Sequence, residues 1–126
     1  MIEILALVTC LILFSLTIFQ VALIFGAPIG KYAWGGQHTV LPRNLKVGSV
    51  ISILFYVSFA IITLSKADLV TILSNQSFLN VAIWVLAGYF WLGVIMNGIS
   101  RSKPERNLMT PVALALALLT TIIALG

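Results

Sequence analysis

The sequence predicts an all-α, polytopic membrane protein folded as a four-transmembrane-helix bundle, and three observations lead to this prediction. Of the 126 residues, 61% are hydrophobic and only 8% are charged, whereas a soluble domain carries roughly 25% charged residues. Four apolar runs, each long enough to cross a hydrocarbon core of about 30 Å, follow one another with short connections. The alternating segments that build membrane β-barrels are absent. We therefore expect a single integral membrane domain over residues 1–126.

The expected spans cover residues 4–25, 47–65, 79–98 and 108–125. Glu3 precedes the first span and no Lys or Arg does, so we interpret this segment as a retained helix and not as a cleaved signal peptide. Backbone groups in lipid must satisfy their own hydrogen bonds, which favours helices for runs this continuous. Thr110 and Pro111 are expected to open the fourth helix, where a proline costs no hydrogen bond.

Basic residues are divided unequally between the two sides of the expected membrane. The connections 26–46 and 99–107 contain every Lys and Arg except Lys66. Because short basic loops stay in the cytoplasm, we expect both termini to lie outside and these two loops to be cytoplasmic. The net charge of +4 then describes a basic face whose partners are membrane lipids, and we expect no nucleic acid partner.

Charged side chains are missing from all four expected spans. Proton-coupled exporters, pumps and voltage sensors need such groups inside the membrane, so the pattern argues against these classes. Cys10 is the only cysteine and is expected to pack as a small apolar residue. A metal site needs several ligands, and Cys10 and His38 are expected to lie far apart. We predict no metal and no cofactor.

Two amides, Gln20 and Asn97, are expected at similar depth near the cytoplasmic boundary. Gln20 lies roughly 7 to 9 Å inside it at 1.5 Å per residue. The two side chains could form an interhelical hydrogen bond of about 0.6 kcal/mol, or they could line a small vestibule. Small residues spaced i,i+4 mark close helix approaches, most of them expected inside the bundle. These pairs are Ala22 and Gly26, Gly48 and Ser52, and Ala113 and Ala117.

The two cytoplasmic connections are the segments where chemistry is most expected. The first mixes glycines with aromatic residues over positions 26–38, and the second is densely charged. Together they are predicted to form a basic, aromatic-edged cap over the vestibule, suited to an anion or a lipid headgroup. Simpler interpretations stay open, because the basic residues serve topology and Glu105 can pair with Arg101 if the segment is helical. The candidate ligand-binding residues are Gln20, Trp34, His38, Asn97 and Arg101.

Two motifs carry a resemblance to known proteins. Residues 26–36 read Gly-Ala-Pro-x-Gly-x-x-Ala-Trp-Gly-Gly, and residues 100–111 read Ser-Arg-Ser-x-x-Glu-Arg-x-x-Met-Thr-Pro. With these motifs the whole chain resembles a family of small four-helix bacterial membrane proteins to which no activity is attached. The resemblance implies a bacterial plasma (inner) membrane and adds no substrate.

The leading hypothesis is a non-enzymatic protein that binds or transports a small hydrophobic or amphipathic molecule through a cytoplasm-facing vestibule. The first alternative is an accessory or structural subunit, joined to a partner membrane protein or to copies of itself. The second is a lipid-modifying enzyme that uses His38 or Glu105 as acid or base. We assign no catalytic residue, because no nucleophile stands beside a base and an orienting group.

Overall fold

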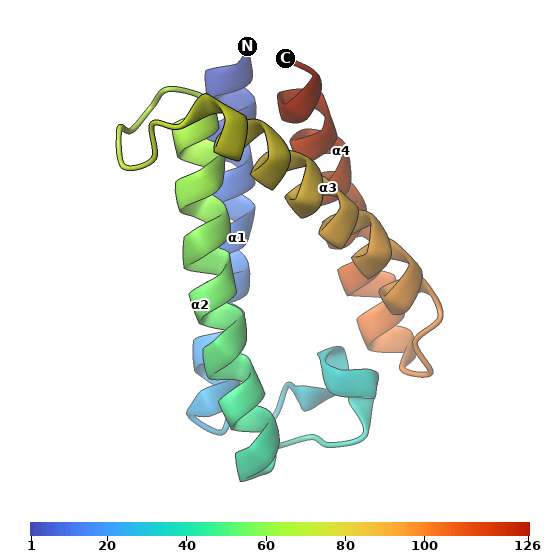
Figure 1. Cartoon of the computed structure of the whole chain (residues 1–126). Coiled ribbons are helices and arrows are strands. Elements are labelled where there is room, and N and C mark those ends of the chain that lie inside the picture. Colours follow the sequence, from blue (N-terminus) through green and yellow to red (C-terminus); the bar gives the residue numbers. More distant parts are fainter.

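The computed structural model describes all 126 residues, and four long α-helices dominate it (Figure 1). The helices are α1 (Ile2–Ile24), α2 (Arg43–Lys66), α3 (Gln76–Gly98) and α4 (Lys103–Leu125). Two short 3₁₀ turns, η1 (Gly30–Tyr32) and η2 (Trp34–Gly36), lie between α1 and α2. The chain forms no strand, so the all-α prediction is confirmed.

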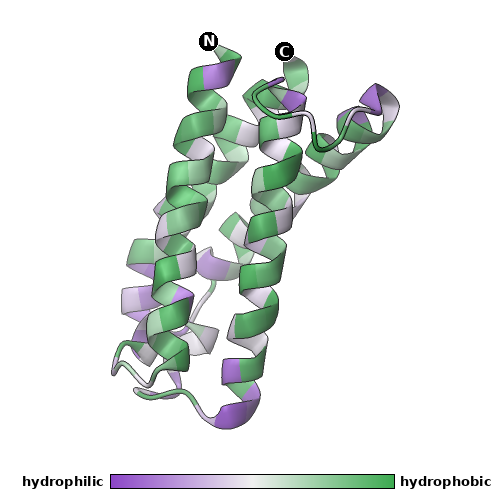
Figure 2. Ribbon diagram, turned by 90° about the vertical axis from the view of Figure 1, so that its left-hand side faces the viewer, coloured by the Kyte–Doolittle hydropathy of each residue, from purple (hydrophilic) through white to green (hydrophobic).

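All four helices are long and apolar enough to cross a membrane, which makes the chain a multi-pass membrane protein. The predicted four-helix membrane bundle is therefore confirmed. Hydrophobic residues cover the shafts of the helices, and the most hydrophilic ones gather toward their ends (Figure 2). Large apolar side chains such as Leu11, Phe14 and Leu54 are exposed along the shafts. In lipid such exposure costs nothing, because acyl chains are as apolar as leucine.

The helices alternate in direction, so that both termini and the α2–α3 connection lie at one end (Figure 1). Helix α1 packs against α2 and α4, while α3 packs against α4 and α2. Helices α2 and α3 approach each other at the end with the termini and diverge toward the other end (Figure 1). The 3₁₀ turns lie at that other end, beside the start of α4.

All four helices begin earlier than hydropathy predicts, and the difference is largest for α2 and α4. Helix α2 starts at Arg43 and α4 at Lys103, whereas the expected spans started at residues 47 and 108. A capping motif explains the start of α4, since the Ser102 Oγ accepts a hydrogen bond from the Glu105 N–H at 3.3 Å. Hydropathy detects the apolar length of a helix and misses polar turns that extend beyond it.

The earlier start of α4 overturns the expected place of Pro111. Pro111 lies inside α4, more than one turn beyond its first residue, and so it does not open the helix. Because proline has no N–H, the Asn107 carbonyl loses its helical donor. Pro104 occupies the first turn instead, where a proline is well tolerated.

The buried core is concentrated in the half of the bundle nearer the termini, which we call the packed half. It contains fully or nearly fully buried side chains from all four helices: Ala6, Thr9, Leu13, Thr63, Leu79, Ile83, Leu86, Ala117, Thr120 and Ile123. The buried threonines bond to their own helices, for example Thr63 to the Phe59 carbonyl at 2.8 Å. These hydroxyls therefore need no partner from another helix.

Candidate functional site

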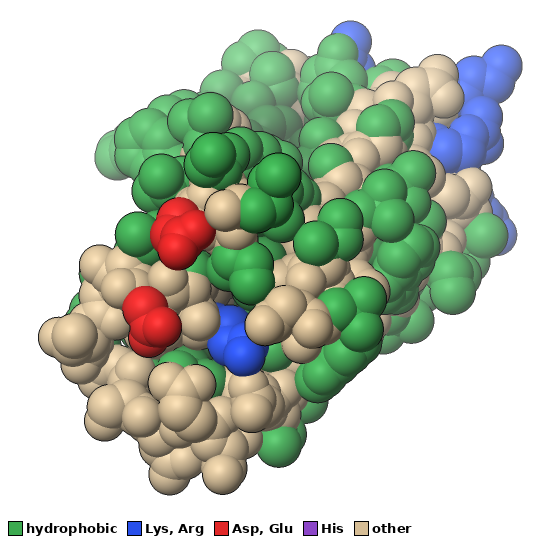
Figure 3. All heavy atoms as spheres, turned by 90° about the horizontal axis from the view of Figure 1, so that it is seen from above, with side chains coloured by type: hydrophobic (Ala, Val, Ile, Leu, Met, Phe, Trp, Pro, Cys, Tyr) green, Lys and Arg blue, Asp and Glu red, His purple; other side chains and the backbone are tan.

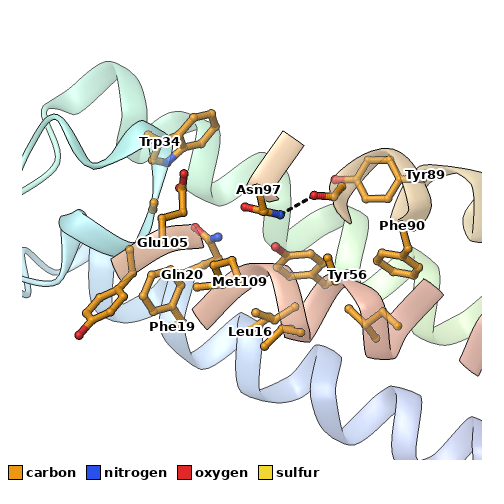
Figure 4. A pocket seen from close by; sticks show the side chains of 16 residues that line it. Leu16, Phe19, Gln20, Trp34, Tyr56, Tyr89, Phe90, Asn97, Glu105 and Met109 are labelled. Carbon is orange, nitrogen blue, oxygen red and sulfur yellow. Dashed lines mark hydrogen bonds between the residues drawn. The ribbon is translucent and has the colours of Figure 1, made fainter. Parts of the chain in front are cut away.

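The opposite half of the bundle contains an open-sided cavity of about 190 Å³, and we call this the hollow half. Sixteen residues from all four helices and from the loop after α1 line the cavity, and twelve of them are hydrophobic. On α4 the lining runs from Glu105 to Leu116, about 16 Å along the helix at 1.5 Å per residue. Trp34 and Glu105 lie at one end of the cavity, and Phe90 lies toward the other (Figure 4).

The loop after α1 folds back as a cap, and glycines allow it to do so. The Gly30 N–H donates to the Thr39 carbonyl at 2.8 Å. A Cβ on Gly30 would stand 2.1 Å from the His38 carbonyl oxygen, so only glycine fits there. The Ser102 hydroxyl, at the start of α4, donates to the Lys31 carbonyl and ties the cap to that helix.

Trp34 connects the cap to α2. Its backbone is in the left-handed region with φ 53, which is unfavourable for a bulky residue. Its indole ring lies over Gly48, where an added Cβ would stand 2.8 Å from two ring carbons. The missing side chain of Gly48 thus provides the space for the indole. Trp34 lines the cavity and remains 44% exposed.

Glu105 is the one charged side chain in the lining, and it is only 8% exposed. Its Oε2 accepts a hydrogen bond from the Gly35 N–H at 3.3 Å, and its Oε1 accepts one from the Ser100 hydroxyl. No basic side chain pairs with it, since the single ion pair of the chain joins the N-terminal amine to Glu3. The pairing with Arg101 that the spacing allowed is wrong, because Arg101 precedes the first residue of α4.

Gln20 and Asn97 both line the cavity, from α1 and α3 (Figure 4). Gln20 is 8% exposed, and its buried Oε1 has no hydrogen-bond partner. Asn97 donates from Nδ2 to the Gly93 carbonyl of its own helix at 2.8 Å. The two amides therefore do not form the interhelical hydrogen bond that the sequence also allowed.

Three of the five candidate residues, Gln20, Trp34 and Asn97, thus come together around one cavity. His38 and Arg101 are exposed and lie outside its lining. Whether the three bind a ligand stays a prediction.

Sequence reasoning missed the contributions of Glu105, Tyr56 and Met109 to the lining. A signal for Glu105 was present in the capping motif. Once α4 begins at Lys103, positions 105, 109, 112, 113 and 116 share one helix face, and all five line the cavity.

Other parts of the molecule offer weaker sites. No group of three or more His, Cys, Asp or Glu side chains could hold a metal ion. Two further hollows of about 300 Å³ each lie between α2 and α3 and between α1 and α4. The first is lined entirely by hydrophobic residues and the second by hydrophobic residues and Ser15. Such grooves suit lipid acyl chains and lack the converging polar groups of a specific site.

No protein-family model, no curated protein and no solved structure matches this chain.

Proposed function

We propose that this chain is a non-enzymatic membrane protein that binds a small amphipathic molecule in the cavity of the hollow half. The observation that carries the proposal is the cavity itself, a hollow of about 190 Å³ that all four helices and the loop after α1 line. Twelve of its sixteen lining residues are hydrophobic, and the polar side chains of Gln20, Asn97 and Glu105 stand among them.

The composition of the lining supports the same function. Apolar walls with a few converging polar groups are typical of small-molecule sites. Here the polar groups are Gln20, Asn97 and Glu105, and aromatic rings form much of the wall. An apolar cavity of about 150 Å³ can hold benzene. A cavity of about 190 Å³ therefore suits a molecule of one ring or a short chain with a polar head.

The contrast with the packed half favours a one-sided pocket over a continuous pore. Ile83, Thr120 and Ile123 are fully buried beyond the cavity, toward the termini. A ligand entering from the loop end would meet this packing. Binding, or transport that requires rearrangement, is therefore favoured over an open channel.

We also propose that the loop end faces the cytoplasm of a bacterial plasma membrane. Seen from the end with the termini, acidic side chains lie near the viewer and basic ones gather mainly at the far end (Figure 3). This distribution agrees with the retention of basic loops in the cytoplasm. In a Cys10→Ala background, Gln37→Cys should react with an impermeant thiol reagent only after permeabilisation, and Leu69→Cys should react in intact cells. The reverse pattern would invert the topology.

Native mass spectrometry on protein gently extracted from its own membrane tests the binding function. We expect a discrete adduct of constant mass on the wild type. Gly93→Leu should abolish this adduct, because the new side chain fills the cavity and its Cβ contacts only the Ala113 Cβ, at 3.8 Å. Gly88→Leu is the matched control on the same helix, since a Cβ there contacts nothing within 4 Å.

An adduct that survives Gly93→Leu would place the ligand elsewhere and contradict the proposal. A wild type without any adduct that always carries a second membrane protein would favour an accessory subunit instead. The structure gives that alternative less support, because two of the three pairs of small residues are used internally. Ala113 and Ala117 are buried, and Trp34 covers Gly48.

A further inference from the structure

We propose that the ligand of this cavity is a small organic cation, an ammonium group on an apolar body of about one ring, with Glu105 as its counter-charge. This inference rests on the binding function proposed above and goes beyond it by assigning the chemical class of the ligand.

The first observation that supports a cationic ligand is the distribution of charge around the cavity. Glu105 is the single charged residue of the lining, and no Lys, Arg or His lines the cavity. Its carboxylate is buried without a cation within 4 Å. Buried carboxylates are normally paired, because an isolated buried charge is costly. A cationic ligand would supply the partner that the chain does not provide.

The hydrogen bonds of Glu105 leave capacity for such a partner. A carboxylate has about four lone-pair sites. Within the chain, Glu105 accepts from the Ser100 hydroxyl and, at the long distance of 3.3 Å, from the Gly35 N–H. The Gly35 contact joins α4 to the cap, the Ser100 contact stays within the start of α4 and its connection, and neither neutralises the charge. An ammonium group has several N–H donors and could use the remaining sites.

One uncharged polar group of the lining adds an acceptor. Asn97 uses its Nδ2 on the Gly93 carbonyl, and no group within the chain donates to its Oδ1. Asn97 therefore joins Glu105 in presenting an oxygen to a ligand that donates. The Gln20 Oε1 is covered by protein atoms and is not counted among these acceptors.

The aromatic residues of the lining favour the same class. Six of them surround the cavity: Phe19, Tyr32, Trp34, Tyr56, Tyr89 and Phe90. The faces of such rings attract cations, by about 0.5 to 2 kcal/mol for each well-placed pair. One ring already makes this contact within the chain, since the Lys31 Nζ lies 5.3 Å from the centre of the Tyr32 ring. Lys31 itself does not line the cavity.

An anionic ligand, which the basic loops suggested from the sequence, fits the cavity poorly. Arg101 is exposed and outside the lining, and Lys103 is also exposed. An anion in the cavity would meet Glu105 with no cation to offset the repulsion. Anions and lipid headgroups are better placed on the outer basic face, where charge near a membrane surface contributes about 1 kcal/mol per residue.

Three probes of similar size separate the possibilities by charge. Benzylamine is a cation at neutral pH, benzyl alcohol is its neutral counterpart, and benzoate is an anion. Titration calorimetry on the full chain in an uncharged detergent, with empty micelles as the blank, gives the three dissociation constants. We expect benzylamine to bind at least about tenfold more tightly than benzyl alcohol, and benzoate to bind most weakly.

Two variants connect that preference to one carboxylate. Glu105→Gln removes the charge and keeps one oxygen, which can still accept from the Gly35 N–H, while its amide can donate to the Ser100 hydroxyl. This variant should bring the benzylamine constant to within about twofold of that of benzyl alcohol. Glu3→Gln removes an exposed acid at the opposite end and should change neither constant. If Glu105→Gln does not fold, the ratio of the benzylamine and benzyl alcohol dissociation constants on the wild type still decides whether the cavity prefers a cation.

Two different failures can be told apart. Binding of benzyl alcohol as tightly as benzylamine, or a preference that survives Glu105→Gln, would overturn the cationic ligand while the binding function stands. Binding of none of the three probes, together with a wild type that carries no adduct in native mass spectrometry, would overturn both.

Discussion

The packed half and the hollow half of this bundle use similar apolar helices and reach opposite results. In the packed half, leucine, isoleucine and alanine side chains fill the centre of the bundle, and Thr9, Thr63 and Thr120 bond to their own helices. In the hollow half, Gln20 and Glu105 reach inward without helical partners, and the loop after α1 replaces direct helix contact. Threonines that bond to their own helices are compatible with close packing, whereas a loop placed between the helix ends leaves a cavity beneath it.

The largest expected effect tests whether the two halves differ in free space. Ala117 is fully buried, so Ala117→Leu should overpack the core and lower stability by about 3 kcal/mol. Gly93→Leu adds more volume but directs it into the cavity, and should cost less than about 1 kcal/mol. Thermal unfolding in detergent, followed by helical circular dichroism, measures both. Equal losses would mean that the hollow half is as closely packed as the other.

A smaller effect is expected for the cap over the hollow half. Gly30→Ala brings a methyl group against the His38 carbonyl and should displace the loop, at a cost of about 2 kcal/mol. Gly35→Ala has open space and incurs only the strain of φ 76, about 1 kcal/mol. In limited proteolysis, the rate of cleavage within the loop should rise much more for Gly30→Ala than for Gly35→Ala. If the two variants are cut at the same rate, the cap is not held by this close approach.

The smallest effect is expected where the indole ring of Trp34 packs against Gly48. Gly48→Ala should push the indole aside with a stability change below about 1 kcal/mol, because a side chain and not the backbone must move. Tryptophan emission should shift for this variant. Gly88→Ala adds a methyl in open space on α3 and should leave the emission unchanged. An unshifted emission spectrum for Gly48→Ala would mean that the Trp34 indole does not pack against Gly48 of α2.

The sequence allowed the fold and part of the site to be predicted. Four long apolar runs can fold in lipid in few ways, and the depths of Gln20 and Asn97 follow from their distance to the ends of those runs. Hydropathy places Glu105 in a connection, because its position depends on one extra polar turn of α4. The position of His38 outside the lining has a related reason: the path of the loop is determined by the contacts of Gly30 and Ser102, which hydropathy does not encode.

Cysteine accessibility tests the contrast between the two halves most directly. In a Cys10→Ala background, Gly93→Cys places a thiol on the cavity wall, and Ala87→Cys places one on the same helix in the packed core. Both changes are small, so neither should disturb the fold. We predict that a small methanethiosulfonate reagent modifies Gly93→Cys at least about tenfold faster than Ala87→Cys, because only the cavity admits the reagent. Equal rates at the two positions would contradict a hollow half, and with it the proposed binding site.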